Sequence, residues 1–278
     1  MTRHIYLYLF SVLLIITSCI RQSPSQDQLV IEGWIENGES PIVFVTTSVT
    51  NTFSEQTLND FISHIALNAK VTVTYQGITY NLLPHITDKY LLGLYYTNDN
   101  LKGETGGSYR LQVQWNDMHA TGITTIPEPG MLDSIYVEPS ADSDTLYSIK
   151  VHVVPTPGKN RYYKFFSKET GRDSTYIASL GSLYDSELVR MDEMIYINRG
   201  ISNPLVEPDP YYHIGDTVYI KMASIGFDSY EYWSKYNEAQ LFSSVVILPY
   251  SNKLKGNLEG ALGYWSGYGI TRYKVNIE

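Results

Sequence analysis

The feature that most constrains the fold is a regular alternation of apolar and polar residues, interrupted by short turns. Val71–Tyr75 and Ile78–Leu82 both alternate in this way, and only Gln76-Gly77 separates them. A period of two is typical of a half-buried strand, and a two-residue turn of this kind joins the strands of a hairpin. The pattern predicts a β-hairpin with one apolar face, formed by Val71, Val73, Tyr75, Ile78, Tyr80 and Leu82.

The same alternation recurs through the first half of the chain. Apolar residues alternate over Tyr109–Trp115, a turn follows at Asn116-Asp117, and Met118–Thr124 continues the pattern. Two earlier strands are predicted at Leu29–Ile35 and Ile42–Thr47. Short strands joined by turns, without crossover helices, predict an antiparallel β-sandwich of the immunoglobulin-like kind.

Two prolines and a glycine within Ile126–Gly130 mark the clearest domain boundary, because they continue neither a strand ladder nor a helix. We therefore predict a β-sandwich domain at residues 28–127 and a second, β-rich domain at residues 128–278. The strands predicted in the second domain are Asp133–Glu138, Ser148–Val154, Tyr162–Phe166, Thr217–Met222 and Thr271–Ile277.

One main α-helix is predicted near Asp228–Leu241. Asp228 and Glu231 have the spacing of a capping box at its start. A stripe at helical spacing then follows one side, formed by Tyr230, Trp233, Asn237 and Leu241. Such a stripe is more often core packing than a ligand site, so we expect the helix to bury Trp233.

The first residues have the pattern of a bacterial lipoprotein signal. A short positive head precedes the apolar run Ile5–Ile16, and small residues then lead to Cys19, the only cysteine in the chain. The alternative is an ordinary secretory signal or a membrane helix, but the run is shorter than the about 20 residues that span a bilayer. We predict a signal peptide at residues 1–18, lipidation of the Cys19 thiol, and a lipidated tether at residues 19–27.

Charge and composition argue against several classes of function. The formal net charge is −9, which disfavours nucleic acid as a partner. With Cys19 committed to lipid, no thiol remains for disulfides, thiolate catalysis or zinc. The histidines are scattered, and neither His-Glu-x-x-His nor Gly-x-Ser-x-Gly occurs. We predict no catalytic residue, no metal ligand and no cofactor.

Four acidic residues lie close together at Asp185, Glu187, Asp192 and Glu193. Carboxylates in such numbers can bind Ca²⁺ or form the acid–base pair of a glycoside hydrolase. Their spacing fits no EF-hand loop, and loops of an acidic protein collect such residues in any case. We expect them to be solvated or to cap turns.

Tyrosine is unusually frequent, with 25 residues against 8 phenylalanines, and some tyrosines lie among glycines or prolines. Aromatic residues on such loops suit recognition, because rigid rings lose little entropy on binding. We predict a candidate contact surface for a receptor or a glycan, formed by Tyr264, Trp265, Tyr268, Tyr211 and Tyr212. The alternative is that Gly263 and Gly267 turn these rings inward, where they pack over the sandwich.

Several landmarks in order along the chain resemble an uncharacterised family of Bacteroidota lipoproteins, domain of unknown function 4249. They are Leu29–Ile35, Gly107–Val113, Thr125-Ile126-Pro127 with Asp133-Ser134-Ile135, Asp192-Glu193 before Asn198-Arg199-Gly200, Gly215–Val218, Tyr230–Trp233 and Ala261–Trp265. The resemblance implies a cell-envelope lipoprotein that accompanies TonB-dependent outer-membrane receptors, and it assigns no catalytic residues. Ile20–Ser23 contain no acidic pair, which favours the periplasmic face of the outer membrane over the cell surface.

The sequence thus predicts a non-enzymatic accessory binding module, anchored to the outer membrane and acting with a TonB-dependent receptor. Two alternatives stay open. One is a glycan-directed envelope hydrolase without a recognisable motif, and the other is a surface adhesin or structural protein.

Overall fold

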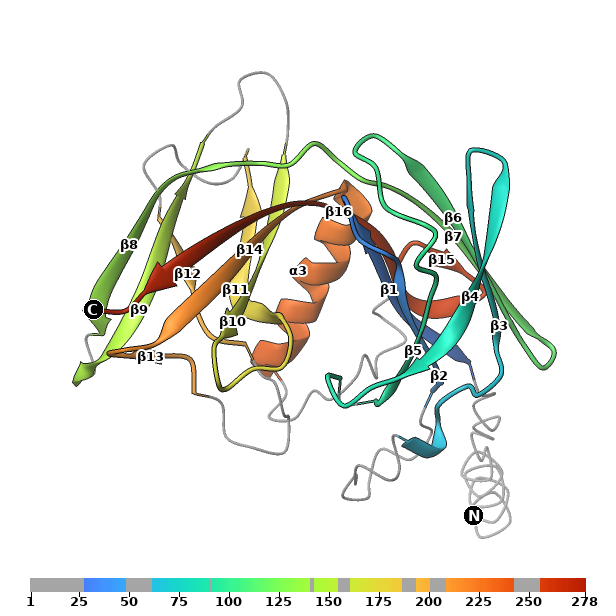
Figure 1. Ribbon diagram of the computed structural model, residues 1–278, viewed down its shortest axis with the longest axis horizontal. Helices are drawn as coiled ribbons and strands as arrows, with labels where there is room; N and C mark the ends of the chain where they lie inside the picture. The colour runs from blue at the N-terminus through green and yellow to red at the C-terminus, as the bar shows by residue number, and fades with distance from the viewer. Residues whose placement is uncertain are drawn as a thin grey trace, which may run out of the picture.

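The structure is a computed structural model, and it describes residues 28–48, 62–90, 92–140, 143–154, 161–186, 194–200, 209–242 and 256–278. The predicted signal peptide, Cys19 and the tether lie outside the described residues. The described part is mostly β with one long helix, as the sequence predicted (Figure 1).

The strands of the first half are joined mainly by hairpins. They are β1 (Leu29–Glu36), β2 (Ile42–Thr47), β3 (Lys70–Tyr75), β4 (Ile78–Ile86), β5 (Leu94–Thr97), β6 (Ser108–Trp115) and β7 (Met118–Thr125). Gln76 and Gly77 both have positive φ, of 49° and 80°, as the turn between twisted hairpin strands requires. The predicted hairpin and its register are confirmed, although Ile78 at its tip is exposed.

The second half contains the remaining strands and the helix. The strands are β8 (Leu132–Ser140), β9 (Ser143–Val153), β10 (Tyr162–Glu169), β11 (Ile177–Asp185), β12 (Ile195–Ile197), β13 (Tyr212–His213), β14 (Thr217–Ile225), β15 (Leu258–Glu259) and β16 (Ala261–Asn276). The helix, α3 (Phe227–Phe242), confirms the prediction near Asp228–Leu241.

One continuous sheet connects the two halves, in the order β11-β10-β14-β16-β1-β2-β5-β4-β3-β6-β7-β15. The long strand β16 lies between β1, to which it is parallel, and β14, to which it is antiparallel. The sheet curls so that β16 also contacts β7. The C-terminal strand therefore closes the first core as well as the second.

The first core lies inside this curl. It contains the inward-facing residues of β1 to β7 together with Leu258 and Trp265 from the end of the chain. We call β1 to β7, β15 and the first part of β16 the first lobe. We call β8 to β14, α3 and the rest of β16 the second lobe.

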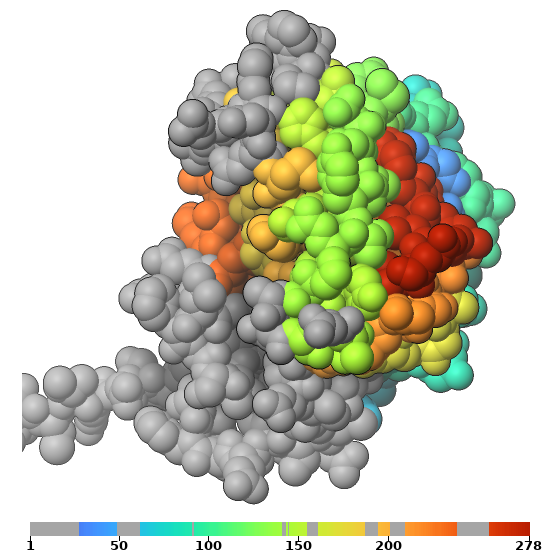
Figure 2. Space-filling model, turned by 90° about the vertical axis from the view of Figure 1, so that its left-hand side faces the viewer, coloured from blue at the N-terminus to red at the C-terminus, as the bar shows by residue number. Residues whose placement is uncertain are grey.

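The second lobe has three layers. β8, β9, β12 and β13 form a separate sheet that packs on one face of β10, β14 and β16, with the second core between them. Figure 2 looks onto this end of the molecule, where β8 and β9 (green) cover the surface beside β16 (red). On the opposite face, α3 packs Trp233 against Tyr264 and Tyr268 of β16. Trp233 is buried, as predicted.

Candidate functional site: a cleft between the lobes

A cleft of about 810 Å³ lies between the lobes. Its first wall begins at β1, where side chains alternate between the two faces of the strand. Ile31 and Ile35 enter the first core, whereas Glu32, Trp34 and Glu36 line the cleft. The strand β1 therefore separates the first core, on its aliphatic face, from the cleft, on the face that carries the two glutamates.

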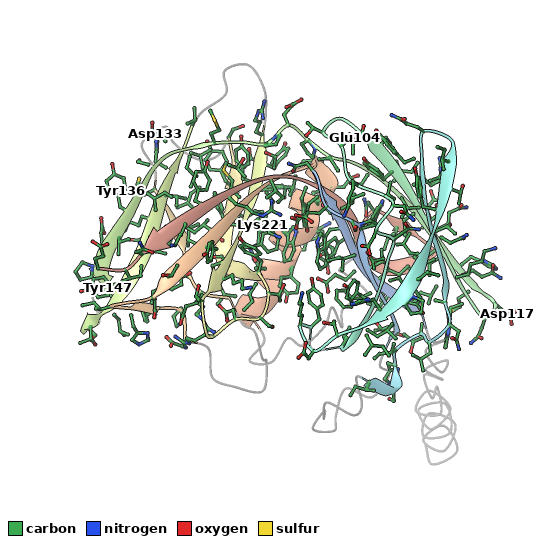
Figure 3. The ribbon with its side chains drawn as sticks, viewed as in Figure 1. Glu104, Asp117, Asp133, Tyr136, Tyr147 and Lys221 are labelled. Carbon is green, nitrogen blue, oxygen red and sulfur yellow. The ribbon has the colours of Figure 1, made fainter. Side chains whose placement is uncertain are left out.

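An ion network crosses the cleft from one lobe to the other. Glu36 is buried, and its two carboxylate oxygens bind Lys221 of β14 at 2.5 Å and Arg272 of β16 at 2.8 Å. Arg272 also lies 3.5 Å from Glu39. Burial lowers the pKa of Lys221, and Glu36 opposes that shift. In Figure 3, Lys221 lies near the middle of the molecule, where the two lobes meet.

Glu32 differs from Glu36 in having no cationic partner among the described residues. The Tyr264 hydroxyl donates to its Oε1 atom at 2.9 Å. Burial raises the pKa of the Glu32 carboxyl, and the hydrogen bond from Tyr264 lowers it by a smaller amount. Glu32 therefore has hydrogen-bonding capacity that the described chain does not use.

Two buried polar atoms at the floor of the cleft also have no hydrogen-bond partner in the described chain. They are Nε1 of Trp233 and the hydroxyl of Tyr268, and both residues line the cleft. Burial raises the pKa of Tyr268 most, and weak side-chain hydrogen bonds with Trp233, Tyr264 and Ser266 lower it by less. These contacts fall outside the geometry of a full hydrogen bond, so Trp233 and Tyr268 can each take a better-aligned partner. An unsatisfied buried polar group costs about 1–3 kcal/mol, which a bound ligand can recover.

Aromatic rings form the wall of the cleft on the side of the first lobe. We call Trp34, Phe44, Tyr90 and Tyr95 the aromatic wall. Their ring centroids are 6.0 Å apart for Trp34 and Phe44, 5.1 Å for Phe44 and Tyr90, and 5.5 Å for Tyr90 and Tyr95. Phe44 is buried, whereas the other three residues are only partly buried and line the cleft.

The model of a protein family matches residues 17–274, almost the whole chain, and the family is described as "Domain of unknown function (DUF4249)". The chain belongs to this family. No curated protein matches it. Among the described residues of this DUF4249 protein, none of the helices is both long and apolar enough to cross a membrane.

The aromatic residues near the C-terminus of this DUF4249 protein do not lie on a glycine-rich loop, so that expectation is wrong. Tyr264, Trp265 and Tyr268 are in β16, with exposed fractions of 4%, 0% and 2%. Alternation along β16 directs Trp265 into the first core, where its Nε1 atom donates to the carbonyl oxygen of Tyr109 at 3.0 Å. Tyr264 and Tyr268 point the other way and line the cleft.

The other two residues of the predicted contact surface are elsewhere. Tyr212 lies in β13 and is wholly buried in the second core. Tyr211 precedes it and is half-buried, and neither residue lines the cleft. The structure therefore does not bring them together with Tyr264 and Tyr268.

The predicted acidic cluster is described only in part. Asp185 is buried at the end of β11, whereas Glu187, Asp192 and Glu193 lie outside the described residues. Within the described ranges, no group of three or more His, Cys, Asp or Glu side chains is placed to hold a metal ion.

The charged residues of the cleft were not predicted from the sequence. A signal existed for Glu32, Trp34 and Glu36, because they alternate with apolar residues in a strand otherwise typical of a buried one. No local signal existed for Lys221 and Arg272. They reach Glu36 only because β14 and β16 join the sheet beside β1.

Proposed function

We propose that this chain is a lipid-anchored outer-membrane protein that acts as a non-enzymatic accessory binding module, with the cleft between its lobes as the ligand site. The observation that carries the proposal is the floor of the cleft, where Glu32, Trp233 and Tyr268 have unused hydrogen-bonding capacity. The cleft volume of about 810 Å³ is in the range typical of small-molecule sites. The lipoprotein signal pattern that ends at Cys19 supports the anchor, and the family resemblance supports a TonB-dependent receptor as partner.

The carboxylates of the cleft favour binding over glycoside hydrolysis. Glu32 and Glu36 share one face of β1 and are four residues apart, which separates their Cα atoms by about 13 Å. A glycosidase needs two carboxyl groups that are both free to act on the glycosidic bond, one of them by delivering a proton. However, both oxygens of Glu36 are already bound by Lys221 and Arg272.

Native mass spectrometry tests the ligand site. The purified protein is incubated with a low-molecular-mass extract of the cell envelope, and bound adducts are recorded over several hours. We expect one adduct of constant mass on the wild type and on Tyr136→Ala, a control at the far end of the molecule (Figure 3). Trp34→Ala should lose the adduct. Absence of any adduct contradicts the ligand site, and conversion of the adduct to smaller products supports the hydrolase.

The anchor is tested separately by membrane fractionation. Cys19→Ala removes the only thiol in the chain. We expect this variant to leave the outer-membrane fraction after a carbonate wash, whereas the wild type stays. An unchanged distribution contradicts lipid anchoring.

The receptor partnership is tested by cross-linking in intact cells, followed by affinity purification of the wild type from outer membranes. We expect one TonB-dependent receptor to be recovered in near-stoichiometric amount. Recovery of fibrous assemblies of this chain alone favours the adhesin or structural alternative.

A further inference from the structure

The charges that line the cleft balance one another. Five carboxylate and five cationic side chains line it, although the whole chain has a formal net charge of −9. Three of these charges are buried: Glu36 and Lys221 are bound to each other, and Asp173 is bound to Arg199. A site without net charge favours a ligand without net charge, because a charged ligand would lose hydration that the cleft does not replace.

The aromatic wall favours a ligand with an apolar face. Trp34, Tyr90 and Tyr95 present partly exposed rings to the cleft, next to the buried Phe44. Aromatic contacts of this kind bury large areas and add stacking energy at low cost in side-chain entropy. The ligand therefore has a flat face of C–H groups.

The polar groups at the floor of the cleft favour a ligand that both donates and accepts hydrogen bonds. The indole N–H of Trp233 can only donate, so it needs an acceptor. Glu32 accepts from Tyr264 through one oxygen only, so its other oxygen can accept from a donor. The Tyr268 hydroxyl can do either. Hydroxyl groups meet all three requirements at once.

We infer that the cleft binds a neutral saccharide, whose ring packs on the aromatic wall and whose hydroxyl groups bind Glu32 and the floor. This inference rests on the proposed function. An organic cation would bind Glu32 but would leave the Trp233 donor unpaired. An anion would face Glu32, and the buried Lys221 and its neighbour Arg272 are already bound to Glu36. Lys89 and Lys102, the cations of the cleft without an ion pair among the described residues, are exposed to water, which weakens their attraction for an anion.

Isothermal titration calorimetry tests the inference with defined probes. The neutral probes are maltohexaose, cellohexaose, xylohexaose and chitohexaose. Choline is the cationic probe and glucose 6-phosphate the anionic one. Each is titrated into the wild type, Trp34→Ala, Trp34→Phe, Glu32→Gln and the control Tyr136→Ala. Each titration is repeated at about 50 mM and about 500 mM salt, because salt weakens binding between charges.

We expect at least one neutral oligosaccharide to bind the wild type and Tyr136→Ala with equal affinity at both salt concentrations. Trp34→Ala should weaken that binding about tenfold or more, and Trp34→Phe should restore part of it, because a ring remains. Glu32→Gln should weaken it about fivefold, because the carboxylate is the stronger acceptor. Recovery with phenylalanine separates lost stacking from a folding defect.

Failure to bind any of the four oligosaccharides at millimolar concentration overturns the inference. Binding of choline or glucose 6-phosphate that depends on Trp34 also overturns it, but leaves the cleft as a ligand site. A wild type that forms no adduct by native mass spectrometry contradicts the proposed function itself. The two failures are therefore distinguishable.

Discussion

At the scale of single residues, Lys164 is an unusual member of the buried layer beneath α3. Only 1% of its surface is exposed, and its Nζ atom donates to the carbonyl oxygen of Ser179 at 2.6 Å. The same atom lies 5.1 Å from the centre of the Trp233 ring. Burial lowers the pKa of this lysine from 10.5 to about 7. The folded protein thus holds the proton on Lys164 less tightly than the unfolded chain does.

We expect Lys164→Met to stabilise the protein in a pH-dependent way. Below pH about 7, Lys164 is charged in both the native and the unfolded state, and the whole cost of burying its charge lowers the free energy of unfolding. This cost disappears as the pH rises toward 10.5, where the lysine of the unfolded chain also loses its proton. The carbonyl of Ser179 keeps a donor in the variant, from the Ser182 hydroxyl at 3.0 Å. Urea unfolding should show a gain of about 1–3 kcal/mol at pH 6 and almost none near pH 10. The exposed Lys274→Met is the control, and equal gains at both pH values would refute the explanation.

Trp265 provides a second prediction at the residue scale. Its ring is wholly buried in the first core, and its Nε1–H bonds to the backbone of Tyr109. Trp265→Ala should therefore lower the free energy of unfolding by roughly 3–5 kcal/mol, as large cavities in cores do. Chemical denaturation measures this loss, with the half-exposed Tyr136→Ala as a control. A change below about 0.5 kcal/mol would place Trp265 outside the core.

At the scale of elements, the local patterns identified most strands but not their partners. The strands around the turns at Gln76-Gly77 and Asn116-Asp117 were predicted with the register that the structure shows. The strands β5, β11, β12, β13 and β15 were not predicted, because they are short or irregular in pattern. Of β16, only the part from Thr271 onward was predicted as a strand. The parallel pairing of β1 with β16 was not predicted either, since no local signal links strands so far apart in the chain.

Gly263 is essential to that parallel pairing. Its φ is +98°, and a Cβ atom at this position would overlap the carbonyl oxygen of Ile31. We expect Gly263→Ala to cost at least about 2 kcal/mol, because both the backbone and the β1–β16 contact become strained. Thermal melting measures the loss. The matched control is Gly226→Ala, where a Cβ atom would meet nothing within 4 Å. Its melting temperature should fall only slightly, because Gly226 caps the start of α3 and alanine is a poorer cap. Equal effects of the two substitutions would contradict this role.

At the scale of the whole molecule, β16 and the Glu36 network join the two lobes. β16 contributes Trp265 to the first core and Val275 to the second. Glu36 of the first lobe binds Lys221 and Arg272 of the second. The lobes therefore share both their sheet and a buried ion network.

We expect a fragment of residues 28–127, the predicted first domain, not to fold alone. Without β16, β1 loses one of its two neighbouring strands, and the first core loses Trp265 and Leu258. Near-UV circular dichroism and denaturant unfolding of the fragment should show neither fixed aromatic packing nor a cooperative transition. The full chain serves as the control. A cooperative transition in the fragment would show that the first lobe is self-sufficient.

The candidate site was harder to predict than the fold. Tyr264 and Tyr268 were singled out as aromatic residues among glycines, and they do line a cleft, although from a strand and not from a loop. Trp265 was grouped with them but faces the opposite way. Adjacent residues in a strand point to opposite faces. The face that a residue occupies can therefore be predicted only after the strand itself has been recognised.

The sequence by itself determined the mostly β fold class, the main hairpins and the helix. These depend on alternation, turn residues and helix signals that act within about 15 residues. Only the tertiary structure decided where the cleft lies, because its chemistry joins distant segments. Glu36 and Lys221 are 185 residues apart in the chain, and Glu32 and Tyr264 are 232 apart. Sheet pairing across such distances is set by how all the strands pack together, and no local pattern encodes it.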